Sequence, residues 1–338
     1  MDDRHAWEQP GAFEVAPGVH RIPLPLPGDA LHAVNVYAIS DGDQVVMIDG
    51  GWAMSQSTEL MRAGLAQIGY ELSDVREFLV THLHRDHYTQ AVAVRRITGS
   101  EVSVGEGERA TLTAIHNLTT HPDIARLTEA GASDVAAEMV SWTVSHAIPD
   151  RTDWEDPDHW LTNGVDLALQ TRTLRVIATP GHTRGHVVFH DRQANALFAG
   201  DHVLPHITPS IGVELLRPSS PLRDYLTSLE LVRGLPDAQL LPAHGPVTGS
   251  VHARIDELLT HHQNRLQTIA DAVDAGADTG YAVARAIGWT RRGRKLDELD
   301  LFNQVLAINE TVAHLIVLVE RGWLVRTVLD GVAHFARS

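Results

Sequence analysis

The spacing of hydrophobic positions along the chain predicts an alternation of strands and helices. Short β-rich runs come first, with Asp41-Gly42-Asp43 as a turn between two of them. A helix follows at about 54–68, where apolar residues recur at helical spacing. Further helices are predicted at 91–97 and over 111–142, the latter broken near Pro122 and Gly131. The predicted strands lie at 18–26, 35–39, 44–48, 77–81, 101–104, 165–168, 174–178, 186–190, 196–198 and 240–241.

The pattern changes after His244-Gly245-Pro246. An amphipathic helix is predicted at 251–273, followed by a bundle-like segment and a long apolar helix at about 301–321. Gly322 ends that helix, and two short strands at 323–328 and 332–335 then form a hairpin. We therefore expect an α/β layered domain over residues 1–250 and a small helical, winged-helix-like domain over 251–338.

Charge and composition narrow the classes of function. The chain has 27 basic and 43 acidic side chains, a net charge of −16, which disfavours a protein whose main partner is nucleic acid or an anionic membrane. Residues 251–338 hold 10 basic and 11 acidic side chains, so a net charge of −15 belongs to residues 1–250. The absence of cysteine excludes disulfides, thiolate metal ligands and a cysteine nucleophile.

The sequence pattern predicts neither a signal peptide nor a membrane-spanning segment. The first residues are acidic and lead into no apolar run of the signal-peptide type. The strongly apolar stretches, such as 315–319, fall short of the ~20 residues that cross a bilayer. We expect a cytoplasmic protein that does not enter a membrane.

Candidate metal ligands are concentrated directly after one predicted strand, in the run His82-x-His84-x-Asp86-His87. A loop at this position can turn all four side chains toward one point. Imidazole and carboxylate suit zinc or another divalent first-row metal. Three further candidates each follow an apolar strand, namely His182, Asp201 and His244. The sequence therefore predicts a metal centre.

With these motifs in this order, residues 13–250 resemble the metallo-β-lactamase-fold hydrolases. The resemblance implies an αββα sandwich with two metal ions at one sheet edge. It implies that Asp201 bridges the two ions, that one ion is held by His82, His84 and His182, and that the other is held by Asp86, His87 and His244. We expect zinc, with iron or manganese as alternatives.

The neighbours of these ligands suggest supporting roles. Asp49, in Ile48-Asp49-Gly50-Gly51, matches an aspartate at the end of an early strand in the family, and we expect it to accept a hydrogen bond from a ligand histidine. His186 and His202 lie beside ligands in the sequence. Two interpretations stay open for them: they support the ligands from behind, or they are packed residues with no role in the site. Residues that bind the substrate are not predicted.

Departures from the family pattern narrow the subgroup. Zinc β-lactamases with a cysteine ligand are excluded, and Tyr88-Thr89-Gln90 stands where many relatives have small glycines, which predicts a different pocket wall. The chain looks most like hydroxyacylglutathione-hydrolase-like members. In residues 200–205 and its carboxy-terminal part it also resembles the β-lactamase-like endoribonucleases.

The resemblance implies a hydrolase in which a metal-bridging hydroxide attacks a small ester, thioester or lactone, as in glyoxalase II. Asp86 would orient that hydroxide or pass its proton to the leaving group. The alternative is a metal-dependent endoribonuclease or phosphodiesterase, with the basic cluster at 291–295 helping to hold RNA. A regulator or homodimer built on the apolar carboxy-terminal helix, and oxidative chemistry at one iron, stay open as further alternatives.

Overall fold

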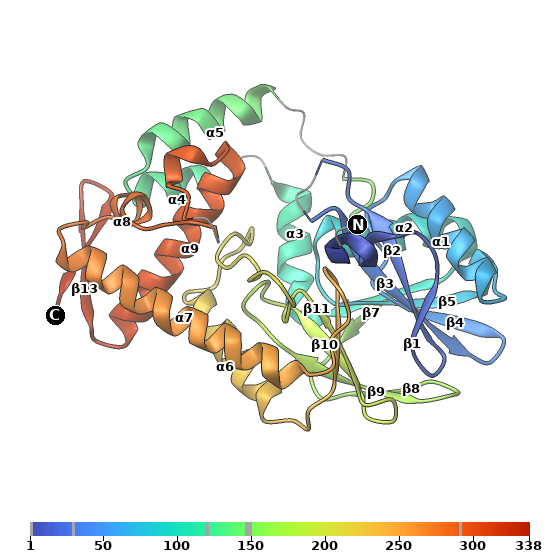
Figure 1. The fold of residues 1–338 in the computed structure, drawn as a ribbon. Coiled ribbons are helices and arrows are strands. Elements are labelled where there is room, and N and C mark those ends of the chain that lie inside the picture. Colours follow the sequence, from blue (N-terminus) through green and yellow to red (C-terminus); the bar gives the residue numbers. More distant parts are fainter. Residues whose placement is uncertain (1–2, 29–30, 119–121, 146–150, 291–292) are drawn as a thin grey trace. The chain divides into compact units, whose positions relative to one another are not determined.

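The computed structural model describes residues 3–28, 31–118, 122–145, 151–290 and 293–338. The chain folds into two compact units, and each is built from separate stretches of sequence (Figure 1). The first unit comprises 1–116, 150–209 and 228–255, and the second comprises 117–149, 210–227 and 256–338.

A seven-stranded sheet forms one layer of the first unit. Its strands pair in chain order, antiparallel from the first to the fourth and parallel from the fourth to the seventh. Most of its central positions are buried on both faces, which explains the continuous apolar runs in the sequence. The strands are β1 (Phe13–Ala16), β2 (Val19–Pro25), β3 (Ala33–Asp41), β4 (Gln44–Ile48), β5 (Val75–Val80), β6 (Glu101–Gly105) and β7 (His159–Leu161).

A five-stranded sheet forms a second layer, in the order β12-β11-β10-β9-β8. β9 and β11 are each antiparallel to β10, and β12 is parallel to β11. The carboxyl ends of β9, β11 and β12 therefore lie at the same edge of this sheet. The strands are β8 (Asp166–Ala168), β9 (Thr173–Ala178), β10 (Val187–Asp191), β11 (Ala196–Gly200) and β12 (Gln239–Pro242).

Two apolar cores hold these layers together. One core packs helices α1 (Ser55–Gln67) and α2 (Arg85–Thr98) against the larger sheet through residues such as Met61, Val92 and Phe78. The other lies between the sheets and joins Ile48 and Leu79 to Phe189 and Phe198. Together they confirm the predicted α/β fold with layered sheets and covering helices.

The second unit is mainly helical. Its long helix α9 is buried along much of its length and packs against α4, α5 and α8. A hairpin of β13 (Leu324–Leu329) and β14 (Val332–Arg337) follows it, as predicted. The winged-helix character of this region stays a prediction. The helices that lie wholly in this unit are α4 (Asp123–Glu129), α5 (Ser133–Ser145), α8 (Gly280–Ala286) and α9 (Leu301–Glu320).

The division of the chain is more complex than the expected boundary near residue 250. Residues 117–149 and 210–227 cluster with the carboxy-terminal region. Helices α4 and α5 pack on the apolar α9, and Ser220 and Arg223 donate hydrogen bonds to Glu320 at its end. Three of the described helices contain a boundary between the two units, so that each begins in one unit and ends in the other. They are α3 (Arg109–Asn117), α6 (Pro221–Arg233) and α7 (Val251–Asp274).

Helix α9 has the length and composition of a membrane-spanning segment, with a mean hydropathy of 1.4. The expectation that every apolar stretch falls well short of this criterion is therefore wrong. About half of the segment, 56%, is buried within the protein, and buried core helices meet the same criterion.

Most predicted elements are present with shifts at their ends, the largest at the start of α2, which begins at Arg85 and not near 91. The sequence pattern missed the short strands β1 and β7 and the helix α6. Four 3-10 turns complete the described elements: η1 (Asp3–Glu8), η2 (Leu72–Asp74), η3 (Glu106–Glu108) and η4 (Leu296–Glu298).

Candidate metal centre

All seven predicted metal ligands lie in the first unit, in two groups. Within each group the potential ligand atoms lie within 4.8 Å of one another. The first group comprises His82, His84, His182 and Asp201, and the second comprises Asp86, His87 and His244.

Each ligand follows the end of a strand. His82 and His84 come after β5, His182 after β9, Asp201 after β11 and His244 after β12. The expectation that a loop carries the whole first motif is wrong. Helix α2 begins at Arg85, so Asp86 and His87 lie in its first turn. The rigid first turn fixes the direction of these two side chains relative to His84.

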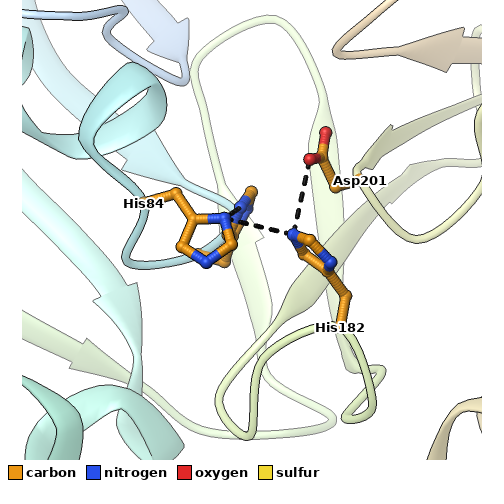
Figure 2. A group of neighbouring side chains, drawn as sticks. His84, His182 and Asp201 are labelled. Carbon is orange, nitrogen blue, oxygen red and sulfur yellow. Dashed lines mark hydrogen bonds and ion pairs between the residues drawn. The ribbon is translucent and has the colours of Figure 1, made fainter. Parts of the chain in front are cut away.

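The first group is a cluster of three imidazoles and one carboxylate. His84 Nδ1 lies 2.9 Å from His82 Nε2 and 3.2 Å from His182 Nε2. Figure 2 shows His84 and His182 turned toward each other, with Asp201 beside His182. Burial, supported by the neighbouring imidazoles, lowers the pKa of His82 well below its usual value and lowers the pKa of His84 to about 3. The imidazoles of His82 and His84 are therefore neutral, the form that binds a metal.

The second group has two ring nitrogens that face one carboxylate and make no hydrogen bond. His87 Nε2 and His244 Nε2 lie 3.6 Å and 3.5 Å from Asp86 Oδ2. Both nitrogens are buried and make no hydrogen bond. Buried polar atoms are normally satisfied, so two such nitrogens converging on one carboxylate fit a cation that is bound between them.

Asp201 connects the two groups through its two oxygens. Its Oδ2 lies 3.4 Å from His182 Nε2, in the first group. Its Oδ1 lies 3.4 Å from His244 Nε2 and 3.7 Å from His87 Nε2, in the second group, and makes no hydrogen bond. The donor set of nitrogen and oxygen atoms thus fits two cations that share this carboxylate.

Asp49 supports the second group from behind. Its Oδ2 accepts a hydrogen bond of 2.9 Å from His87 Nδ1, and its Oδ1 accepts one of 2.8 Å from the backbone N–H of Thr81. This fixes the proton of His87 on Nδ1 and leaves Nε2 turned toward Asp86 and Asp201. Although burial opposes it, the carboxylates of Asp49, Asp86 and Asp201 raise the pKa of His87 to about 10. At this pKa His87 carries a second proton, on Nε2, when no metal is bound. A cation bound here would take the place of that proton.

His186 supports the carboxylate that both groups share. The backbone N–H of Asp201 donates to His186 Nε2 at 3.2 Å, and His186 Nδ1 lies 2.8 Å from Thr179 Oγ1. The ring also stacks on His82, with centroids 5.0 Å apart. His202 is buried and lies farther out, with its ring centroid 6.1 Å from that of His186.

Tyr88, Thr89 and Gln90, which stand where many relatives have glycines, are buried side chains of α2, and the expected difference in the pocket wall stays a prediction. Tyr88 is fully buried in the core beneath α2, and its hydroxyl donates to the carbonyl oxygen of Glu155. Thr89 and Gln90 accept hydrogen bonds from the backbone of Ala53 and Met54. Thr89 and Gln90 therefore attach α2 to the segment after β4, and Tyr88 attaches it to the segment before β7.

Sequence reasoning missed three residues that contact the ligand loops. Thr81 Oγ1 lies 3.1 Å from His82 Nδ1, and Glu108 accepts hydrogen bonds from Thr183 and Leu83. Thr81 and Thr183 adjoin ligands, which could have indicated them. Glu108 follows a buried strand in Gly105-Glu106-Gly107-Glu108, and nothing in its residue type or spacing distinguishes it from Glu106.

Comparisons with known proteins agree with this geometry. Residues 30–244 match the model of the metallo-beta-lactamase superfamily. The crystal structure of a beta-lactamase domain protein from Burkholderia ambifaria is similar over 97% of this chain and 94% of its own, with 28% identity and a TM-score of 0.80.

Two curated relatives are similar over more than two thirds of this chain. A beta-lactamase-like protein 2 homolog from Caenorhabditis elegans is 25% identical over 71% of this chain and 65% of its own length. An atrochrysone carboxyl ACP thioesterase from Aspergillus fumigatus is 25% identical over 73% of this chain and 46% of its own length. The chain thus matches less than two thirds of either relative. The family match over residues 30–244 and the ligand groups within them establish that the chain belongs to the metallo-β-lactamase superfamily.

Proposed function

We propose that the chain is a two-metal hydrolase that cleaves small thioesters, with esters and lactones as related substrates. The observation that carries this proposal is the position of Asp201, whose two oxygens face different ligand groups. A site for a single ion in the first group would leave the unsatisfied nitrogens of His87 and His244, in the second group, without a function. Zinc is the expected metal, because the donor set is imidazole and carboxylate.

When bound, two such ions lower the pKa of a water molecule to near neutrality and polarise the carbonyl group under attack. The protein's own residues prepare the site for this chemistry. Asp49 keeps one proton on His87 Nδ1, and the backbone carbonyl of Ala33 holds His244 through Nδ1 at 2.8 Å. Both imidazoles are thereby held with Nε2 facing the same carboxylates.

Asp86 is the residue that we assign to proton transfer. Its Oδ2 faces His87 and His244, which leaves Oδ1 for a proton on its way to the leaving group. Its side chain is 17% exposed, whereas those of His87 and His244 are 0% and 3% exposed. Asp86 is therefore the member of the second group that a substrate can reach most easily.

Two observations favour a thioester over a nucleic acid. The similarity to a named acyl carrier protein thioesterase supports thioester chemistry. The net charge of −16 opposes the approach of a polyanion.

The test is a substrate panel with zinc-loaded protein: acyl thioesters, aryl esters, lactones, a phosphodiester and single-stranded RNA. We expect thioesters to have the highest kcat/KM, and we expect Asp86→Asn to lower kcat more than KM. Cleavage of RNA or the phosphodiester with a kcat/KM above that of every acyl substrate would overturn the proposed substrate class.

A further inference from the structure

We infer that Glu108 is a positioning residue for the first ligand group, acting by tying together the two loops that carry His82, His84 and His182. The inference rests on the proposed metal centre and adds a residue that lies outside both ligand groups. Glu108 ends the turn η3, after β6, and its side chain is completely buried.

One oxygen atom makes both connections. Glu108 Oε1 accepts a hydrogen bond from the hydroxyl of Thr183, the residue after His182. The same oxygen accepts the backbone N–H of Leu83, between His82 and His84, at 3.4 Å. A single carboxylate therefore spans the loop after β5 and the loop after β9, which are about 100 residues apart in sequence and carry all three imidazoles of the group.

The backbone is built to bring this carboxylate close. A Cβ added at Gly105 would lie 2.1 Å from the carbonyl oxygen of Gly185, and one added at Gly185 would lie 2.2 Å from the backbone nitrogen of Glu108. Only glycine permits such an approach. The strand end before Glu108 and the loop that carries His182 are thus in direct backbone contact.

The second ligand group has separate supports. Asp49 holds His87 and the carbonyl of Ala33 holds His244. Neither of these contacts involves Glu108. Loss of Glu108 should therefore loosen the first group selectively, whereas a general packing defect would affect both groups.

A carboxylate with this role also has an energetic cost. Burial raises the pKa of Glu108 to about 6, against the hydrogen bonds from Thr183 and Leu83 that lower it. An apolar side chain at this position would avoid the cost of burying a charge but would make neither connection.

The experiment is a zinc titration of the full chain in competition with a chromogenic chelator. It compares the wild type with Glu108→Ala, Glu108→Gln, Thr183→Val and Thr183→Ser. We expect Glu108→Ala and Thr183→Val to weaken one of the two zinc-binding steps by about 10–100-fold and to leave the other unchanged. Glu108→Gln keeps the acceptor oxygen and Thr183→Ser keeps the hydroxyl, so both should retain the wild-type affinity.

Two further variants show whether the loss of zinc affinity belongs to the first ligand group. In a His244→Ala background, which removes a ligand of the second group, the remaining step should still respond to Glu108→Ala. Glu77→Ala is the matched control: Glu77 lies on β5 and accepts a hydrogen bond from Ser103, away from both ligand loops. It should leave both zinc affinities unchanged even where it lowers the free energy of unfolding.

Unchanged zinc affinities in a folded Glu108→Ala protein would overturn the inference. If that variant does not fold, equal affinities in Thr183→Val and Thr183→Ser overturn it instead. A failure of the metal centre itself looks different, because the wild type and His82→Ala would then take up zinc equally weakly, and that result overturns both proposals.

Discussion

The carboxylate of Asp201 is shared between the two ligand groups, so its charge matters more than its shape. Asp201→Asn keeps the size of the side chain but removes the negative charge between two sets of imidazoles. We expect kcat/KM to fall by more than the 10–100-fold that is typical of residues behind the ligands, together with a loss of bound metal. Steady-state kinetics and metal analysis on the same preparation check this.

His82→Ala should be comparably severe, because it removes a ligand of the first group. Asp49→Asn should stay within the 10–100-fold range, because Asp49 only orients His87. Full activity of Asp201→Asn at the metal loading of the wild type would contradict the shared role of this carboxylate.

Burial of Glu108 contributes a pH dependence to the stability of the chain, and its sign follows from the raised pKa of this carboxyl. Burial raises its pKa from 4.5 to about 6, so the folded protein holds this proton more tightly than the unfolded chain. The contribution to stability is present below pH 4.5 and is lost as the pH rises through about 6. The shift corresponds to about 2 kcal/mol.

The measurement is the free energy of unfolding of metal-free protein against pH, for the wild type and Glu108→Gln. The variant cannot titrate at this position, whereas all other groups titrate in both proteins. We expect the difference in stability, wild type minus variant, to decrease between pH 4 and 7. A constant difference would show that the pKa of Glu108 is the same in the folded and unfolded chain.

At the residue scale, the sequence identified those site residues whose chemistry is visible in their type and spacing. The run from His82 to His87 places four metal-binding side chains within six positions, and Asp49 ends a predicted strand. Glu108 could not be identified in this way, because a carboxylate that binds two loops has no spacing signal. Its partners, Thr183 and the backbone of Leu83, are set by tertiary packing.

At the scale of elements, hydrophobic periodicity predicted strands well and placed the start of α2 too late. The apolar pattern begins at Ala91, whereas the helix begins at Arg85. Its first turn is polar because it carries Asp86 and His87. Periodicity fails where the residues are selected for binding rather than for burial.

Helix α2 depends on close contact with the segment after β4. The backbone N–H of Gly50 donates to the carbonyl oxygen of His87 at 2.7 Å, and a Cβ on Gly50 would lie 2.5 Å from the backbone nitrogen of Ala91. We expect Gly50→Ala to destabilise the fold by about 1–3 kcal/mol through overpacking. It should also weaken zinc binding, because the first turn that carries His87 must move.

Gly249→Ala is the matched control for this prediction. A Cβ at Gly249 meets nothing within 4 Å, and its φ lies outside the left-handed range. Chemical denaturation and zinc titration of both variants provide the comparison. If Gly50→Ala is as stable as Gly249→Ala, the contact between α2 and the segment after β4 does not constrain the site.

For the whole molecule, the sequence predicted the fold class but not how the chain is divided. Residues 117–149 join the carboxy-terminal unit because α4 and α5 pack on α9, and residues 210–227 join it with polar contacts such as those of Ser220 and Arg223 to Glu320. Such partners come from distant segments, so a boundary at 250 was the simplest division that a linear pattern could give. Of the predicted basic cluster, Arg291 and Arg292 lie outside the described residues, and Lys295 donates to the carbonyl oxygen of Ala286.

The charge of the whole molecule separates thioester hydrolysis from RNA cleavage. An RNA substrate would be bound through phosphate contacts, so affinity would fall by about 0.7 log units per log unit of salt for each single-strand contact. We expect a thioester to show no such slope. Replacing Arg291, Arg292, Arg294 and Lys295 with alanine should leave its kcat/KM nearly unchanged. Efficient RNA cleavage that disappears in this variant and in His82→Ala would reverse the order of the two functions.

The most direct test of the two-metal account is the metal content of purified protein, measured by elemental analysis after loading with zinc and removal of free metal. We expect close to two ions per chain in the wild type and close to one in His244→Ala. A content near one in fully loaded wild type, unchanged in His244→Ala, would contradict it.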